Sequence, residues 1–237
     1  MTTLRTPFGK DSFVSIYIHY ILYIFLIDFM RRPITIALLL AFAMAVTAQS
    51  AMKVLDKTAS SIRKAGDVQV KFAAATFVDG VEQTSTEGVM LLRDKSMQLT
   101  TPEMRMWYDG HTQWSMINES GEVNVTNPTE REMAAINPYT FISHYKKGYR
   151  LTMRESTLRG QATYEVHMLA TKPDNPAQEI YVDVARADHM PLCIRIRQGK
   201  EWNRITIKSL QGGMKLADSD FVFPSSEYRD VEVIDLR

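Results

Sequence analysis

The 237-residue sequence has a single cysteine, almost no net charge and none of the common motifs of enzyme active sites. One cysteine cannot form an internal disulfide or a cysteine-rich zinc site, so both are excluded. The 28 Lys and Arg residues balance 27 Asp and Glu residues, which leaves no excess positive charge for nucleic-acid phosphates. With 45% hydrophobic residues, the composition indicates one or two ordinary globular domains with a sizeable core.

Long hydrophobic runs are confined to the first 48 residues. The basic start Met30-Arg31-Arg32, the apolar run Ile34–Val46 and the small residues up to Ala48 are typical of a secretory signal peptide. Another apolar run, Phe13–Met30, precedes it so closely that a membrane hairpin has no room to turn.

We therefore expect three segments. Residues 1–29 are expected to be an over-extended gene start, residues 30–48 a cleaved signal peptide, and residues 49–237 a single exported domain. The alternative is an uncleaved N-terminal membrane anchor.

The exported part begins with one predicted helix and continues with strands. Apolar residues at helical spacing predict a helix from Ala51 to Lys64, which Gly66 ends. Alternation of apolar and polar residues then predicts an antiparallel sandwich or barrel. The predicted strands are Val68–Ala74, Gly88–Arg93, Ser96–Thr101, Met104–Tyr108, Thr112–Ile117, Glu122–Thr126, Tyr149–Glu155, Thr163–Ala170, Glu179–Ala185, Leu192–Arg197 and Trp202–Leu210.

Two short helices are predicted between the strands, at about residues 128–136 and 138–146. Asn127-Pro128 and Asn137-Pro138 each place an N-cap residue before a proline at the first helical position, and Glu130 follows the first cap by three residues. Their few apolar residues are enough for a lid that lies on a sheet.

The sequence offers no strong candidate for a catalytic residue. The histidines His111, His144, His167 and His189 show no ligand spacing, and Cys193 has no activating neighbour in sequence. Asp218 and Asp220 fit a solvated turn as well as an acid/base pair. We therefore expect no enzyme activity, no metal and no cofactor.

Methionine is the unusual residue. Met90, Met104, Met106, Met116, Met153 and Met168 all fall in predicted strands. Methionine is unbranched and polarizable, so a surface rich in it adapts to irregular apolar partners. The pattern favours an adaptable apolar cavity over a generic core, as in the mouth of a β-barrel.

Several segments, in their order and spacing, resemble the LolA family of outer-membrane lipoprotein carriers in a Bacteroidetes-type form. These segments are Met104–Trp114, Glu122–Glu130, Ile136–Phe141, Asp220–Pro224 and Val233–Asp235. The resemblance implies an unclosed, strongly curved antiparallel β-barrel, or half-barrel, whose concave apolar face is covered by short helices.

The resemblance also implies a function and a set of site residues. The protein would shelter the acyl chains of lipoproteins between an inner-membrane lipoprotein-releasing ABC transporter and an outer-membrane acceptor, as a monomer that binds no nucleic acid. The lid would include Pro138, Phe141 and Ile142. The cavity lining would comprise Phe72, Met90, Leu92, Met106, Trp114, Met116, Leu151 and Met153.

One departure from the family pattern concerns a lid latch. Better-known members carry an Arg-Pro pair where this sequence reads Leu92-Arg93-Asp94-Lys95, so Arg93 is a candidate for the latch and a solvated turn residue is the alternative. Two other functions stay open: a half-barrel lipid or lipoprotein sensor that regulates a membrane partner, and a lipid-modifying hydrolase.

Overall fold

The computed structural model describes residues 50–129, 132–133 and 148–237. Contacts divide the chain into two compact units, Met1–Val46 and Thr47–Arg237, and every described residue belongs to the second. Among the described residues, no helix is long and apolar enough to cross a membrane.

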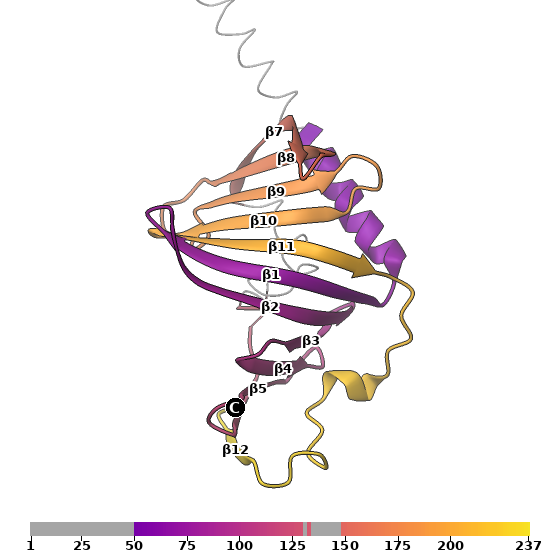
Figure 1. Cartoon of the computed structure of the whole chain (residues 1–237), viewed down its shortest axis with the longest axis vertical. Helices are drawn as coiled ribbons and strands as arrows, with labels where there is room; N and C mark the ends of the chain where they lie inside the picture. Colours follow the sequence, from indigo (N-terminus) through magenta and orange to yellow (C-terminus); the bar gives the residue numbers. More distant parts are fainter. Residues whose placement is uncertain (1–49, 130–131, 134–147) are drawn as a thin grey trace, which may run out of the picture. The chain divides into compact units, whose positions relative to one another are not determined.

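The second unit is mainly β. Its strands are β1 (Val68–Val78), β2 (Val81–Arg93), β3 (Ser96–Thr100), β4 (Met104–Tyr108), β5 (Gln113–Ile117), β6 (Glu122–Thr126), β7 (Tyr149–Leu158), β8 (Gln161–Ala170), β9 (Glu179–Ala185), β10 (Pro191–Gln198), β11 (Glu201–Gln211) and β12 (Glu232–Asp235). They form one unclosed sheet in the order β12-β6-β5-β4-β3-β2-β1-β11-β10-β9-β8-β7. Figure 1 shows the run from β5 to β7 in this order. All neighbours are antiparallel except β12, which lies parallel to β6.

Within the described residues, a helix of residues 50–65 precedes the sheet. Its apolar residues recur at helical spacing and are buried in a cluster with residues of β7 to β10. The helix contributes Ala51, Val54, Leu55 and Ile62 to this cluster. Gly66 follows the helix with a φ of +69°, a conformation that glycine adopts without strain. The predicted helix is therefore confirmed.

The strand registers define which residues share the face that carries the helix. Ile194 of the helix cluster lies opposite Ile205 in β11, and Ile205 lies opposite Ala74 in β1. Directly opposed residues share a face, and so do residues two apart in a strand. The helix-bearing face therefore continues through Val70 into a second buried cluster. That cluster comprises Val68, Val70, Leu92, Met97, Met106, Tyr108 and Met133.

A third buried cluster lies on the opposite face of the sheet. It joins Trp107 and Met116 to Phe223, which follows the 3₁₀ helix η1 (Asp218–Phe221). The Trp107 ring meets the Phe223 ring edge-on, with 5.4 Å between centroids. The C-terminal segment thus covers this face of β4 to β6 before it ends as β12.

The sheet is strongly curved. Arg159, in the turn between β7 and β8, donates a hydrogen bond of 3.1 Å to the carbonyl oxygen of Ile207 in β11. Three strand spacings separate β8 from β11, about 14 Å in a flat sheet, which is well beyond the reach of one side chain. The curved, unclosed antiparallel sheet that the sequence predicted is thus confirmed.

The first predicted helix of the lid has a different start from the one expected. Thr129 Oγ1 accepts a hydrogen bond from the Glu132 N–H at 3.4 Å, and the Glu132 carboxylate accepts one from the Thr129 N–H at 2.7 Å. This is a capping box, so Thr129 is the N-cap, and the assignment of Asn127 was wrong. Asn127 instead accepts a hydrogen bond from Thr112 Oγ1. Residues 138–146, the second predicted helix, lie outside the described residues.

Candidate functional site

Six of the eight residues predicted to line a cavity share the helix-bearing face. Met90 lies opposite Val70 and Leu99, and Leu99 lies opposite Met106. Phe72 and Leu92 share this face with Val70 and Met90 because they lie two positions away in the same strands. Leu151 and Met153 lie opposite Met168 and Val166 in the helix cluster.

Trp114 and Met116 lie on the opposite face, so their predicted placement was wrong. In the register of β4 and β5, Met106 lies opposite Ser115, so these two residues share the helix-bearing face. Trp114 and Met116 flank Ser115 in β5 and therefore point to the opposite face. Both residues pack there with the cluster around Phe223. The physical reason is that the C-terminal segment buries a second apolar layer, which needs apolar side chains of its own.

The helix-bearing face also carries apolar residues that are only half-buried. Met90, Leu99, Met104, Ile207 and Leu210 pack around the second cluster, and Met153, Ile196 and Ile205 pack around the helix cluster. Met97 and Met133 are fully part of the second cluster, and sequence reasoning missed both as site residues. Met97 had a usable signal, because it alternates with Leu99 in a predicted strand. The face is therefore broad, apolar and rich in methionine.

Gly88 shows how closely this face is packed at β2. A Cβ atom at Gly88 would lie 2.6 Å from Cζ of Phe72 and 2.7 Å from the carbonyl oxygen of Thr100. Glycine thus leaves the space that the Phe72 ring occupies, and Phe72 is 7% exposed. Next to this ring, the side chains of β2 change from apolar, at Met90 and Leu92, to polar, at Thr86 and Thr84.

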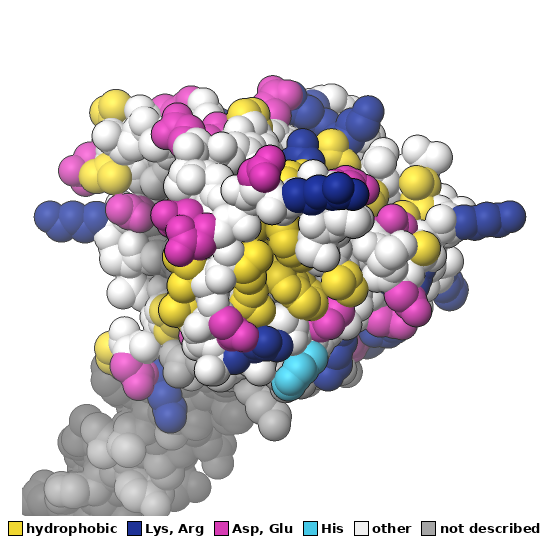
Figure 2. All heavy atoms as spheres, turned by 90° about the horizontal axis from the view of Figure 1, so that it is seen from below, with side chains coloured by type: hydrophobic (Ala, Val, Ile, Leu, Met, Phe, Trp, Pro, Cys, Tyr) yellow, Lys and Arg dark blue, Asp and Glu magenta, His cyan; other side chains and the backbone are white. Residues whose placement is uncertain are grey.

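Apolar side chains also reach the surface. Figure 2 views the molecule from the end at which β12 lies in Figure 1, and it shows hydrophobic side chains gathered in the middle of this view. Lys, Arg, Asp and Glu side chains surround them. An exposed apolar area with a charged border is typical of a surface that binds an apolar partner.

Arg93, the candidate lid latch, contacts the C-terminal segment. Its Nε lies 3.2 Å from Asp67 Oδ2, one of its terminal nitrogens lies 2.7 Å from Asp218 Oδ1, and its guanidinium lies 5.3 Å from the centre of the Phe221 ring. Among described residues, Arg93 therefore ties β2 to η1. Pro138, Phe141 and Ile142, the predicted lid residues, lie outside the described residues.

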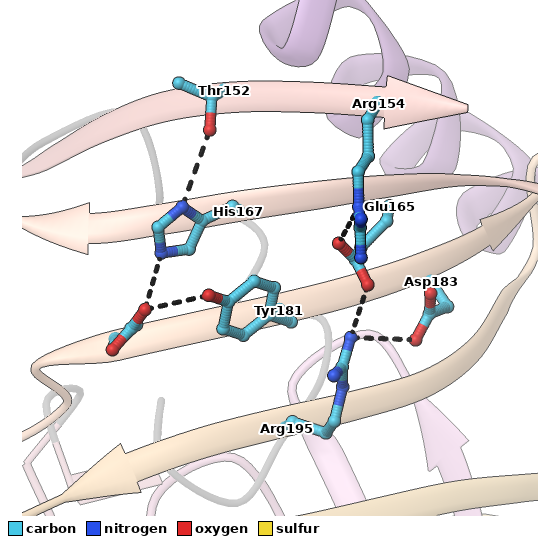
Figure 3. Close-up of polar contacts among 8 residues, drawn as sticks. Thr152, Arg154, Glu165, His167, Tyr181, Asp183 and Arg195 are labelled. Carbon is cyan, nitrogen blue, oxygen red and sulfur yellow. Dashed lines mark hydrogen bonds and ion pairs between the residues drawn. The ribbon is translucent and has the colours of Figure 1, made fainter. Parts of the chain in front are cut away.

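A polar network covers the opposite face of β7 to β10 (Figure 3). Glu165 accepts a hydrogen bond of 2.6 Å from Arg154 Nε and one of 2.8 Å from Arg195. The hydrogen bond from Arg154 and the Arg195 guanidinium hold the pKa of Glu165 below its ordinary value. The Asp183 carboxylate lies 3.5 Å from Arg195, and burial raises its pKa.

The second half of this network centres on Glu179. Its carboxylate lies 2.9 Å from His167 Nε2, accepts a hydrogen bond of 2.9 Å from the Tyr181 hydroxyl and pairs with Arg197 at 3.0 Å. Burial raises the pKa of Glu179, but these partners outweigh it and leave the pKa lowered. The Tyr181 ring stacks on the His167 ring with 4.4 Å between centroids, and the Arg195 guanidinium lies 4.6 Å from the centre of the Tyr181 ring. Each carboxylate is thus paired with arginine, which is the pattern of a structural network.

The described residues show no arrangement of side chains that is typical of a catalytic site. Burial raises the pKa of the Cys193 thiol, which disfavours the reactive thiolate. His111, His167 and His189 lie in three separate places, and no group of three or more described His, Cys, Asp or Glu side chains is arranged to hold a metal ion. Asp218 pairs with Arg93, and Asp220 accepts a hydrogen bond from the Ala217 N–H.

Comparisons with known proteins agree with this description. The family model described as "Outer membrane lipoprotein carrier protein LolA" matches residues 40–200. No curated protein matches the sequence. An uncharacterized conserved protein from Thermus thermophilus has a similar fold, with a TM-score of 0.54 and 9% identity over 78% of this chain and 99% of that one.

Two further solved structures align with lower TM-scores. A LolA superfamily protein from Nitrosomonas europaea aligns with a TM-score of 0.41 and 12% identity over 75% of this chain and 98% of its own. An outer membrane lipoprotein-sorting protein domain from Vibrio parahaemolyticus aligns with a TM-score of 0.46 and 10% identity, over 77% and 99%. From the family match over most of its length, this chain belongs to the LolA family of outer membrane lipoprotein carrier proteins.

Proposed function

We propose that the protein is a periplasmic carrier that binds the acyl chains of lipoproteins on its helix-bearing face and takes them from the inner to the outer membrane. The observation that supports this most is the continuous methionine-rich apolar face, which the registers extend across β1 to β4 and β7 to β11. The site residues in this proposal are Phe72, Met90, Leu92, Met106, Leu151 and Met153, with Leu99 and Met104 added.

The energetics favour a face of this kind. Each buried CH₂ group of an acyl chain contributes about 0.8 kcal/mol, so a lipidated protein crosses water only when its chains are covered. A carrier must also release its cargo, which favours a deformable site over a rigid pocket. Methionine side chains provide that deformability because they are unbranched and have three rotatable bonds.

The remaining parts of the proposal concern the lid and the partners. Pro138, Phe141 and Ile142 are proposed to cover bound acyl chains, and Arg93, which contacts Asp218 of η1, is proposed to latch this lid. The proposed partners are lipidated outer-membrane lipoproteins, an inner-membrane lipoprotein-releasing ABC transporter and an outer-membrane acceptor. The proposed carrier works as a monomer and needs no cofactor.

The proposal is tested with a ten-residue peptide that carries two palmitoyl chains on an N-terminal cysteine. We expect the lipidated peptide to co-elute with the protein in gel filtration without detergent, and the peptide without acyl chains to elute separately. Phe141→Asp is expected to abolish co-elution, with circular dichroism as the check on folding. No co-elution by the unchanged protein would contradict the carrier proposal, and mass analysis that shows a cleaved peptide would favour the hydrolase.

A further inference from the structure

About half of β2 has a paired strand on one side only. Strand β1 pairs with β2 from Val81 to Leu92, but β3 pairs only with Val89–Arg93. No other described strand pairs with β2 on that side. The segment Val81–Thr86, which we call the β2 ledge, therefore presents one row of backbone N–H and C=O groups without a neighbouring described strand. Its first five residues are exposed.

The β2 ledge lacks most of the features that protect sheet edges. Natural edges are blunted by charged side chains, proline or strong twist. The outermost strands follow this rule, because β7 carries exposed Arg150, Arg154 and Glu155, and β12 carries Glu232 and Asp235. The β2 ledge, with the sequence Val-Glu-Gln-Thr-Ser-Thr, has no lysine or proline, and its only charged residue, Glu82, lies 3.9 Å from Arg204. Valine and threonine also favour extended structure.

The β2 ledge is continuous with the apolar face. Thr86 is four residues from Met90, and at about 3.3 Å per residue the two lie about 13 Å apart along the strand. Gly88, beneath the Phe72 ring, marks the transition between them. A molecule with acyl chains near Met90 and Leu99 would thus reach the ledge with the first residues of an attached polypeptide.

We propose that the β2 ledge pairs with the extended backbone of the cargo polypeptide directly after its lipidated end, which adds one strand to the sheet. This inference rests on the proposed function, because the acyl chains bring the polypeptide to the ledge. Backbone pairing recognises an extended chain without a fixed sequence, which suits a carrier of different cargo proteins.

The lipid is essential to this pairing. A short strand on an exposed edge is at best marginally stable as a free peptide. Tethering raises its effective concentration to the millimolar range, which increases overall affinity by about 10²- to 10⁴-fold when the geometry permits both contacts. The same peptide without acyl chains should therefore leave the ledge unpaired at micromolar concentration.

Hydrogen exchange of the full chain tests this pairing. Three probes are compared: the dipalmitoylated ten-residue peptide, the same lipopeptide with alternate amides N-methylated, and palmitate. We expect the lipopeptide to slow exchange of those amides in Val81–Thr86 that point away from β1 at least tenfold, and the N-methylated lipopeptide and palmitate to leave them unchanged. The amides of Thr152–Ser156 in β7 are the control edge.

The outcomes separate this inference from the proposed function. If the lipopeptide binds but exchange in Val81–Thr86 stays unchanged, the added strand is refuted and the carrier proposal stands. If neither the lipopeptide nor palmitate binds, both fail. Protection of the ledge that rises with protein concentration in the absence of peptide would also overturn the inference, because a second copy of the chain would then occupy the edge.

Discussion

Neighbouring residues of one strand have different environments in this sheet. Met90 lies on the helix-bearing face beside Leu99, whereas Leu91 lies opposite Gln69 and Gln98 on the other face. The buried acidic side chains also lie on one face of the sheet. Glu165 and Asp183, with side chains only 9% and 7% exposed, belong to the face away from the helix, where arginines pair with them.

Glu165 is expected to stabilise the fold through its two arginines. Glu165→Gln should lower the free energy of unfolding by about 2–4 kcal/mol at pH 7, because Arg154 and Arg195 lose a buried ionic partner. The pKa of Glu165 is lowered by folding, so its contribution is present above its unfolded pKa and is lost as pH falls through its folded pKa. Urea unfolding at pH 7 and below pH 4 should therefore show the difference shrinking in acid.

The matched control for this variant is Glu155→Gln. Glu155 pairs with Arg186 at 3.1 Å, but both side chains are largely exposed. Its loss should cost less than about 0.5 kcal/mol. Equal effects of the two substitutions would contradict the role assigned to burial.

Asp183 should show the opposite dependence on pH. Burial raises the pKa of Asp183, so the folded state holds the proton more tightly than the unfolded state. As pH rises from the unfolded pKa to the folded pKa, ionisation of Asp183 therefore destabilises the fold. We expect Asp183→Asn to be neutral or stabilising by about 1 kcal/mol at pH 8, and without effect below the unfolded pKa. A marked loss of stability at pH 8, measured by urea unfolding, would show that the ionised carboxylate is needed.

At the scale of elements, the helical residues Glu132 and Met133 follow an N-cap at Thr129. Hydrogen bonds from the Thr129 backbone and side chain lower the pKa of Glu132. Thr129→Ala removes the side-chain partner and should raise the pKa of Glu132 toward its ordinary value, whereas Asn127→Ala should leave it unchanged. A carboxyl titration by NMR measures both variants. A change in the Asn127 variant alone would restore Asn127 as the N-cap.

Strand positions could be predicted from the sequence, but their faces could be predicted only in part. Alternation located most strands because one face of each is apolar. It missed the first half of β2, where Glu82, Gln83 and Ser85 place polar residues on both faces. It misplaced Trp114 and Met116 because alternation gives two sets of residues in a strand and cannot tell which set faces the helix when both faces of the sheet are covered.

At the scale of the whole molecule, the two faces of the sheet differ in composition. The helix-bearing face is broad and apolar, with many half-buried methionine and aliphatic side chains. The other face contains the buried cluster around Trp107 and the arginine-carboxylate network, which consolidate the sheet. Buried clusters on both faces hold the fold together, so the half-buried side chains around them on the helix-bearing face can adapt without loss of the fold.

The most direct test of the account compares acyl binding by variants of the two faces. The double variant Met90→Gln with Leu99→Gln alters the helix-bearing face, and Val89→Gln with Leu91→Gln alters half-buried residues on the other face. Titration with the dipalmitoylated peptide should show at least tenfold weaker binding, or about 1.4 kcal/mol, for the first variant and an unchanged dissociation constant for the second. Equal loss in both variants, or loss only in the second, would contradict the assignment of acyl binding to the helix-bearing face.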